Sequence, residues 1–295
     1  MSKFIYFLKL IRINNLLLLA LTQGLIHFFL FEDNKVTDFV LLLFVTFFIT
    51  SSGYIINDIF DVKSDKINKK DLIIGNHISA RNVIIWYYLF SLIAIILAIY
   101  LLYLNRNFYL FVIILSSIYL LWRYSKRYKH SFFIGNFIVS LLTSLSIFNV
   151  FLVSSNDSTT SFAFDLTLMF SLFSFLLTFT REIIKDLEDL DGDKLMNSQN
   201  IASKLSVAQS KQIVIGILTL VLSLILIGCY YFSNEISTLR PISIYIYSFL
   251  LFIFSLFSVF KVSKSERKED YSYISNLLKL IMFLGVLSIP IIYYI

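Results

Sequence analysis

The chain has 295 residues, of which 58% are apolar and 17% aromatic, and its mean hydropathy is +0.81. Because a soluble fold of this length cannot bury so large an apolar fraction, the composition indicates a polytopic membrane protein. The net charge of +6 does not indicate a nucleic-acid partner, since the basic residues flank apolar runs instead of gathering in one soluble segment.

The apolar runs predict about nine transmembrane helices, because a helix needs roughly 17 to 25 residues to cross the bilayer core. The runs lie at residues 13–31, 37–56, 82–104, 107–122, 131–153, 162–182, 211–232, 240–260 and 272–294. The fourth run is short, and only Asn105-Arg106-Asn107 separates it from the third, so eight spans are the alternative. No small-residue cleavage site follows the first run, which indicates a retained span. We expect an all-α membrane helix bundle in which residues 1–295 form a single domain.

The distribution of basic residues predicts the orientation. With nine spans, 21 of the 25 lysines and arginines fall on the side of the N-terminus, and only Lys35, Arg106 and Arg240 fall opposite. Lys279 lies within the last run. Because basic loops stay in the cytoplasm, the N-terminus is predicted to be cytoplasmic.

A row of acidic residues closes the second run, on the predicted cytoplasmic side. Asn57 and Asp58 are followed by Asp61 and Asp65, so three aspartates stand at i, i+3 and i+7. On a helix this spacing stacks like charges along one face, which is unfavourable unless a cation holds them. The alternative is an ordinary solvated helix end with Lys63 and Lys66 as ion-pair partners.

A second row follows the sixth run with the same spacing, at Asp186, Asp189 and Asp193. Alone it could be a charged surface loop, but two such rows favour a shared metal site. A divalent cation held by carboxylates keeps waters and takes phosphate oxygens as further ligands. The two rows therefore predict a site for a diphosphate at the membrane surface.

Basic and polar residues that could bind a diphosphate lie on the same side, although flanking of the spans also explains each of them. They are Arg12, Asn15, Tyr124, Lys126, Arg127, Lys129, Arg181 and Lys185.

With these residues assembled, the chain resembles the UbiA superfamily of intramembrane prenyltransferases along nearly its whole length. Residues 57–65 match the family's Asn-Asp-x-x-Asp-x-x-x-Asp motif, and Asp189 and Asp193 match its Asp-x-x-x-Asp motif. Further matches are Arg12, Asn15, Tyr124, Ser125, Lys129, Gly135 and Asn136. Members often carry Pro-x-Arg after the first motif; here it is missing, and Lys69 or Lys70 would have to substitute for the arginine.

The resemblance implies Mg²⁺-dependent transfer of a prenyl chain from an isoprenyl diphosphate to a lipophilic acceptor, at a site facing the cytoplasm. It implies metal ligands at Asn57, Asp58, Asp61, Asp65, Asp186, Asp189 and Asp193. Asp61, Asp65, Asp189 and Asp193 would be catalytic. Diphosphate ligands would be Arg12, Asn15, Tyr124, Lys129, Arg181 and Lys185.

The second motif is similar to that of members that use a prenylglycerol phosphate such as geranylgeranylglyceryl phosphate, so this acceptor is expected ahead of an aromatic quinone precursor. Two other functions remain open: a relative that binds isoprenyl diphosphate without turnover, and a cation-coupled secondary transporter, whose acids should lie near the membrane midplane at interrupted helices. Membrane lipids are expected around the chain, and no obligate protein partner is inferred.

Overall fold

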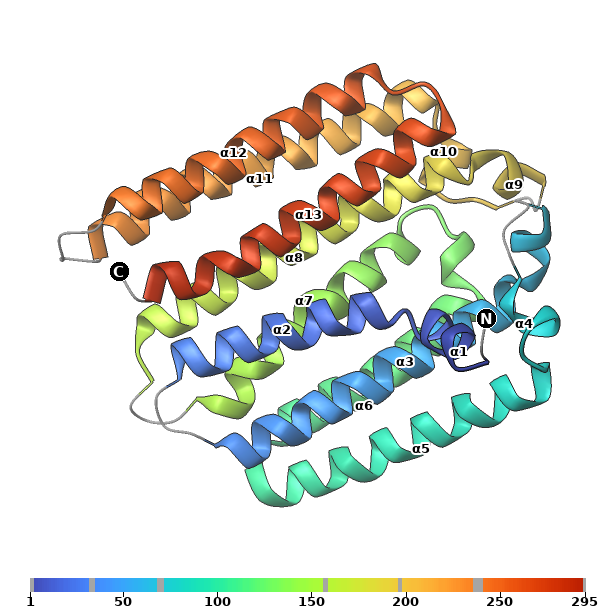
Figure 1. Cartoon of the computed structure of the whole chain (residues 1–295), viewed down its shortest axis with the longest axis horizontal. Helices are drawn as coiled ribbons and strands as arrows, with labels where there is room; N and C mark the ends of the chain where they lie inside the picture. The colour runs from blue at the N-terminus through green and yellow to red at the C-terminus, as the bar shows by residue number, and fades with distance from the viewer. Residues whose placement is uncertain are drawn as a thin grey trace.

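A computed structural model describes residues 3–31, 35–67, 72–155, 159–195, 198–235 and 241–293. Its long helices lie side by side, and four short helices gather at one end of the bundle (Figure 1). The elements are α1 (Lys3–Leu10), α2 (Ile13–Leu30), α3 (Val36–Ile67), α4 (Ile73–Asn76), α5 (Ala80–Asn105), α6 (Phe108–Lys126), η1 (Tyr128–His130), α7 (Ile134–Ser154), α8 (Ser161–Glu188), α9 (Leu190–Leu195), α10 (Ile201–Lys204), α11 (Val207–Glu235), α12 (Pro241–Lys264) and α13 (Lys268–Tyr293). We call the end with α1, α4, α9 and α10 the aspartate end.

The predicted nine spans are confirmed. Within the described residues, nine helices are long and apolar enough to cross a membrane: α2, α3, α5, α6, α7, α8, α11, α12 and α13. The short break between the third and fourth spans is a complete helix boundary. Arg106 ends α5 with a φ of 59°, and the Asn107 side chain caps α6 by accepting a hydrogen bond from the backbone N–H of Leu110 at 3.0 Å.

The two acidic rows differ in backbone structure. The first row lies on one uninterrupted helix, as predicted, because α3 continues to Ile67. The second row does not: α8 ends at Glu188, and Asp189 has φ −97° and ψ 8°, a conformation between helix and turn. Asp193 therefore lies on α9, and the prediction of one continuous helix face is wrong for this row.

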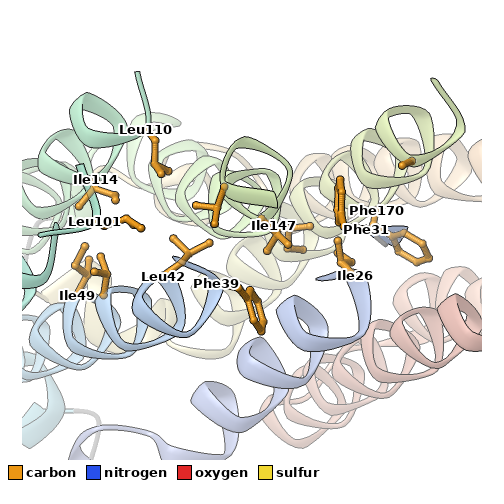
Figure 2. Close-up of a cluster of buried hydrophobic side chains, with 14 of the residues drawn as sticks. Ile26, Phe31, Phe39, Leu42, Ile49, Leu101, Leu110, Ile114, Ile147 and Phe170 are labelled. Carbon is orange, nitrogen blue, oxygen red and sulfur yellow. The ribbon is translucent and has the colours of Figure 1, made fainter. Parts of the chain in front are cut away.

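The main apolar core lies away from the aspartate end and joins seven of the spans, α2, α3, α5, α6, α7, α8 and α13. Figure 2 shows Ile26 of α2, Leu101 of α5, Leu110 of α6, Ile147 of α7 and Phe170 of α8 within it, alongside residues of α3. Burying these side chains against one another gives the close helix packing on which membrane bundles depend.

Polar cross-links also join the helices inside this bundle. The Gln23 amide of α2 donates to the Thr46 hydroxyl of α3 at 3.2 Å and to the Ser146 carbonyl of α7 at 2.7 Å. His27 Nδ1 and the Ser154 hydroxyl are 2.7 Å apart. Such contacts between spans fix α2, α3 and α7 relative to one another.

Helix α1 meets α2 at the aspartate end through a sharp bend. Arg12, between the two helices, has φ 53° and ψ 53°, which is the left-handed region. Leu10 and Ile11, just before the bend, are buried with Ile55 of α3 and Val83 of α5. The bend thereby fixes the start of α2 against the end of α3 that carries the first acidic row.

Candidate active site

A cavity of about 250 Å³ lies inside the bundle, lined by residues of α2, α3, α6, α7, α8 and α13. Along α2 its lining runs from Arg12 to Thr22, which is about 15 Å at 1.5 Å per residue. At the aspartate end its wall is polar and charged: Arg12, Asn15, Tyr54, Asn57, Tyr124, Arg181, Glu182 and Lys185. Its deeper wall includes core residues such as Ile147 and Phe170. One end of the cavity is suited to a charged group and the rest to an apolar chain.

The first acidic row borders this cavity through hydrogen-bonded basic and amide side chains. Arg12 donates to Asp58 Oδ1 at 3.1 Å. The buried Asp61 carboxylate accepts a hydrogen bond from Asn57 at 2.6 Å and another from Lys129. Both hydrogen bonds to Asp61 end on the same oxygen, Oδ2, which fixes the orientation of this carboxylate.

Arg12 is held from a second side by an aromatic ring. Its guanidinium lies 4.7 Å from the centre of the Tyr54 ring, and Asn15 donates to the Tyr54 hydroxyl at 3.2 Å. Stacking on the ring and the ion pair with Asp58 together orient the guanidinium at the charged end of the cavity.

The second acidic row is held by amide side chains. Asn136 of α7 donates to Asp186 at 2.8 Å, and Asn200 donates to Asp193 at 2.6 Å. Burial raises the pKa of the Asp193 carboxyl above its ordinary value, and the Asn200 hydrogen bond opposes this rise. Lys129 interacts electrostatically with Asp186 and Asp193 as well as bonding Asp61. One lysine thus lies between the two rows.

The position of Lys129 depends on a close approach at Gly135. A Cβ atom at Gly135 would lie 2.6 Å from the backbone oxygen of Tyr128 and 3.1 Å from Cα of Lys129. Only a residue without a side chain lets the first turn of α7 pack against η1 in this way.

Replacing Gly135 by alanine is therefore expected to displace η1 and with it Lys129. Because the clash is with backbone rather than with a flexible side chain, we expect a loss of stability of about 1–3 kcal/mol. Thermal unfolding in detergent would measure it. Gly216 is the matched control, since nothing lies within 4 Å of a Cβ built there. Equal melting temperatures for Gly135→Ala and Gly216→Ala would contradict the packing role.

A third charged group lies on α8. Glu182 accepts a hydrogen bond from Lys185 at 2.6 Å and pairs with Arg181 at 3.5 Å. The Nε atom of Arg181 is buried and has no hydrogen-bond partner in the described part of the chain. The Arg181 and Glu182 side chains are only 15% and 14% exposed, so these charges face the cavity more than solvent.

Most of the predicted diphosphate ligands come together. Arg12, Asn15, Tyr124, Arg181 and Lys185 all line the cavity, whereas Lys129 bonds Asp61 instead. Lys126 and Arg127 are exposed. Lys69 and Lys70 lie outside the described residues.

Sequence reasoning assigned no role to four residues that build the site, Tyr54, Glu182, Asn200 and Lys279, and it noted Asn136 only as a match to the family. A signal existed for two of them. Glu182 stands three residues before Lys185 on a helix, where side chains meet. Lys279 is a charged residue within an apolar span.

The oxygen donors of the two rows fit a hard divalent cation such as Mg²⁺. The buried Oδ1 of Asn57 has no hydrogen-bond partner among the residues described, as expected of an atom that can serve as a ligand. In the same part of the chain, no three acidic, histidine or cysteine side chains are close enough together to form a complete metal site. A bound Mg²⁺ would therefore need further oxygen ligands from water and phosphate.

Comparisons with known proteins agree with this arrangement. Residues 17–287 match the sequence model of the UbiA prenyltransferase family. The chain is 35% identical to digeranylgeranylglyceryl phosphate synthase of Methanococcus aeolicus over 64% of each chain, so it spans less than two thirds of that relative. It is 33% identical to the enzyme of the same name from Saccharolobus solfataricus, over 73% of this chain and 74% of the relative.

Solved structures have the same fold. A structure of digeranylgeranylglyceryl phosphate synthase matches with a TM-score of 0.73 and 25% identity, covering 99% of this chain and 98% of the other. A UbiA homologue from Archaeoglobus fulgidus, bound to GPP and Mg²⁺, matches with a TM-score of 0.64 and 17% identity, over 98% of this chain and 100% of the other. The family match covers most of the chain, and the fold agrees with it from end to end. This chain belongs to the UbiA prenyltransferase family.

Proposed function

We propose that this protein transfers a prenyl chain from an isoprenyl diphosphate to a prenylglycerol phosphate in a Mg²⁺-dependent reaction. The observation that carries the proposal is the cavity, whose long apolar part ends at a charged wall. This wall includes Arg12, which pairs with Asp58 of the first acidic row, and Lys185, which directly precedes Asp186 of the second. An amphiphile with a diphosphate head and a hydrocarbon tail fits this division. The relatives named for digeranylgeranylglyceryl phosphate synthesis favour the prenylglycerol phosphate acceptor over an aromatic one.

The metal would be held by Asn57, Asp58, Asp61 and Asp65 on one side and by Asp186, Asp189 and Asp193 on the other. When bound, Mg²⁺ neutralises the negative charge that develops on a leaving diphosphate. Asp61, Asp65, Asp189 and Asp193 would act closest to the reacting atoms.

The basic residues would change partners when the donor binds. Arg12 and Lys129 bond aspartates in the free protein. With these carboxylates occupied by metal, both cations are available for diphosphate oxygens, together with Asn15, Tyr124, Arg181 and Lys185. Fixed donors of this kind stabilise the leaving group where its charge develops. The apolar cavity wall keeps water from the ionised prenyl chain, which water would otherwise capture.

We further propose that residues 1–295 act as one integral membrane domain with the N-terminus and the site facing the cytoplasm. The excess of basic residues at that end of the spans supports this orientation. The acids lie at helix ends on α3 and α8, not at broken helices near the midplane, which favours an enzyme over a transporter.

Turnover by the purified protein tests the proposal. Labelled geranylgeranyl diphosphate and Mg²⁺ are supplied with geranylgeranylglyceryl phosphate, dihydroxynaphthoate or hydroxybenzoate as acceptor. We expect product with geranylgeranylglyceryl phosphate and none after EDTA is added. Product with an aromatic acceptor alone would overturn the choice of acceptor, and product that persists in EDTA would overturn the metal requirement.

A further inference from the structure

Lys279 is a charged residue in the last span to which the proposed reaction gives no role. It lies on α13, eleven residues after the helix begins, and its side chain lines the cavity. It has no hydrogen bond or ion pair among the residues described. A lysine inside a membrane span is costly and by default indicates a function.

The electrostatic neighbours of Lys279 are on α8 and at the bend before α2. Its charge interacts with Arg181, Arg12 and Glu182. Side chains on a helix lean toward the N-terminal end of that helix, and α8 and α13 run in opposite directions. The side chains of Arg181 and Lys279 therefore lean toward each other along the cavity wall.

This wall carries more positive than negative charge. Arg181, Lys185 and Lys279 line it together with a single acid, Glu182, which is bonded to Lys185 and Arg181. Arg12, by contrast, already pairs with Asp58 of the first acidic row. An excess of cations facing a mostly apolar cavity is favourable only when an anion occupies the space between them.

Of the cations on this wall, Arg181 and Lys185 are assigned above to the donor diphosphate, whereas Lys279 and the buried Nε of Arg181 have no assigned anion. We propose that Lys279, with the Nε of Arg181, forms a separate subsite for the phosphate group of the acceptor. The inference rests on the proposed function. The ligand chemistry is a phosphate oxyanion, which either the acceptor phosphate or the donor diphosphate could supply. We favour the acceptor, because the proposed donor site already supplies the diphosphate with Arg12, Lys129 and Lys185 as cationic partners.

Such a subsite would select the acceptor by charge. A buried cation pair rejects a ligand that lacks the anion, because the cations are then left uncompensated. The protein should therefore discriminate strongly between a prenylglycerol phosphate and the same prenylglycerol without phosphate. A neutral aromatic alcohol would be rejected for the same reason.

The experiment compares Lys279→Met, which removes the charge at similar volume, with Lys279→Arg, which keeps it. Lys264→Met is the matched control, since Lys264 is exposed on α12 and does not line the cavity. Binding of geranylgeranylglyceryl phosphate and of unphosphorylated geranylgeranylglycerol is measured without donor in EDTA. Turnover with geranylgeranyl diphosphate and Mg²⁺ then gives KM for each substrate.

We expect Lys279→Met to weaken binding of the phosphorylated acceptor by about ten- to hundred-fold, the cost of losing a hydrogen bond to a charged group. Binding of the unphosphorylated lipid and KM for the donor should stay within about two-fold, and Lys279→Arg should retain most of the affinity. The melting temperature of Lys279→Met should not fall, because the variant removes an uncompensated charge, whereas a purely structural lysine would lower it.

Three results would overturn the inference. The unaltered protein could bind both lipids equally, or Lys279→Met could keep the preference for the phosphorylated lipid. Lys279→Met could also raise only the KM for the donor, which would place Lys279 on the diphosphate. Failure of the proposed function looks different. In that case the unaltered protein prefers the phosphorylated lipid in EDTA, Lys279→Met loses this preference, and no product forms with donor and Mg²⁺.

Discussion

Replacing Asp61 by asparagine is expected to lower kcat by about a hundred- to thousand-fold, the range seen when a preorganised electrostatic contact to a transition state is lost. Asp61 is buried, accepts hydrogen bonds from Asn57 and Lys129, and stands in the middle of the first row. Asparagine keeps the size of the side chain but removes its negative charge, so the substitution weakens the binding of the cation. Lys129 would also lose its ionic partner.

Steady-state turnover against Mg²⁺ concentration measures this effect. In the variant we expect a higher Mg²⁺ requirement as well as a lower maximum rate. Asp38→Asn is the matched control, because Asp38 lies on the same helix at its other end and accepts a hydrogen bond from Asn105 at 3.0 Å. An unchanged Mg²⁺ dependence in Asp61→Asn would remove Asp61 from the metal site.

Replacing Glu182 by glutamine is expected to destabilise the folded protein by about 3–5 kcal/mol, the cost of removing one partner of a buried ion pair. Glu182 is 14% exposed and compensates Arg181 and Lys185, which are 15% and 29% exposed. With Lys279 on the same wall, three cations would then face one another in a low-dielectric cavity. Their repulsion adds to the cost of burying each charge.

Thermal unfolding in detergent measures this loss. Inorganic diphosphate should raise the melting temperature of Glu182→Gln more than that of the unaltered protein, because an anion replaces the missing charge. Asp165→Asn is the control on the same helix; Asp165 lies near its start and accepts a hydrogen bond from Tyr231 at 2.8 Å. If both variants unfold at the same temperature, Glu182 does not hold this cluster together.

Much of the fold could be predicted because bilayer thickness fixes helix length and apolar composition. The break at Asn105-Arg106-Asn107 was predicted with eight spans as the alternative, because only three polar residues separate the two apolar runs; the structure has the break. The break at Asp189 was not predicted, because the spacing of Asp186, Asp189 and Asp193 fits a continuous helix equally well. Residue spacing shows which side chains would share a face of a continuous helix, but it does not show whether the helix continues.

The site was predicted in part, for a related reason. Charged residues in repeated patterns, such as Asp58 and Asp61, are visible in one sequence. Asn136, Asn200 and Tyr54 are single polar residues whose roles depend on contacts between distant segments. Asn136 lies 50 residues before the carboxylate that it holds, and no local pattern reports such a contact.

The left-handed backbone of Arg12 has a consequence for how α1 and the site affect each other. A residue with a side chain adopts this conformation at a cost of roughly 1–2 kcal/mol, which surrounding contacts must offset. Here the offsetting contacts are the burial of Leu10 and Ile11 and the interactions of Arg12 with Asp58 and Tyr54; the proposed ligands would rearrange the interaction with Asp58. In the proposed reaction Arg12 leaves Asp58 when the donor binds, so α1 would be held less firmly at this bend in the occupied protein than in the free one.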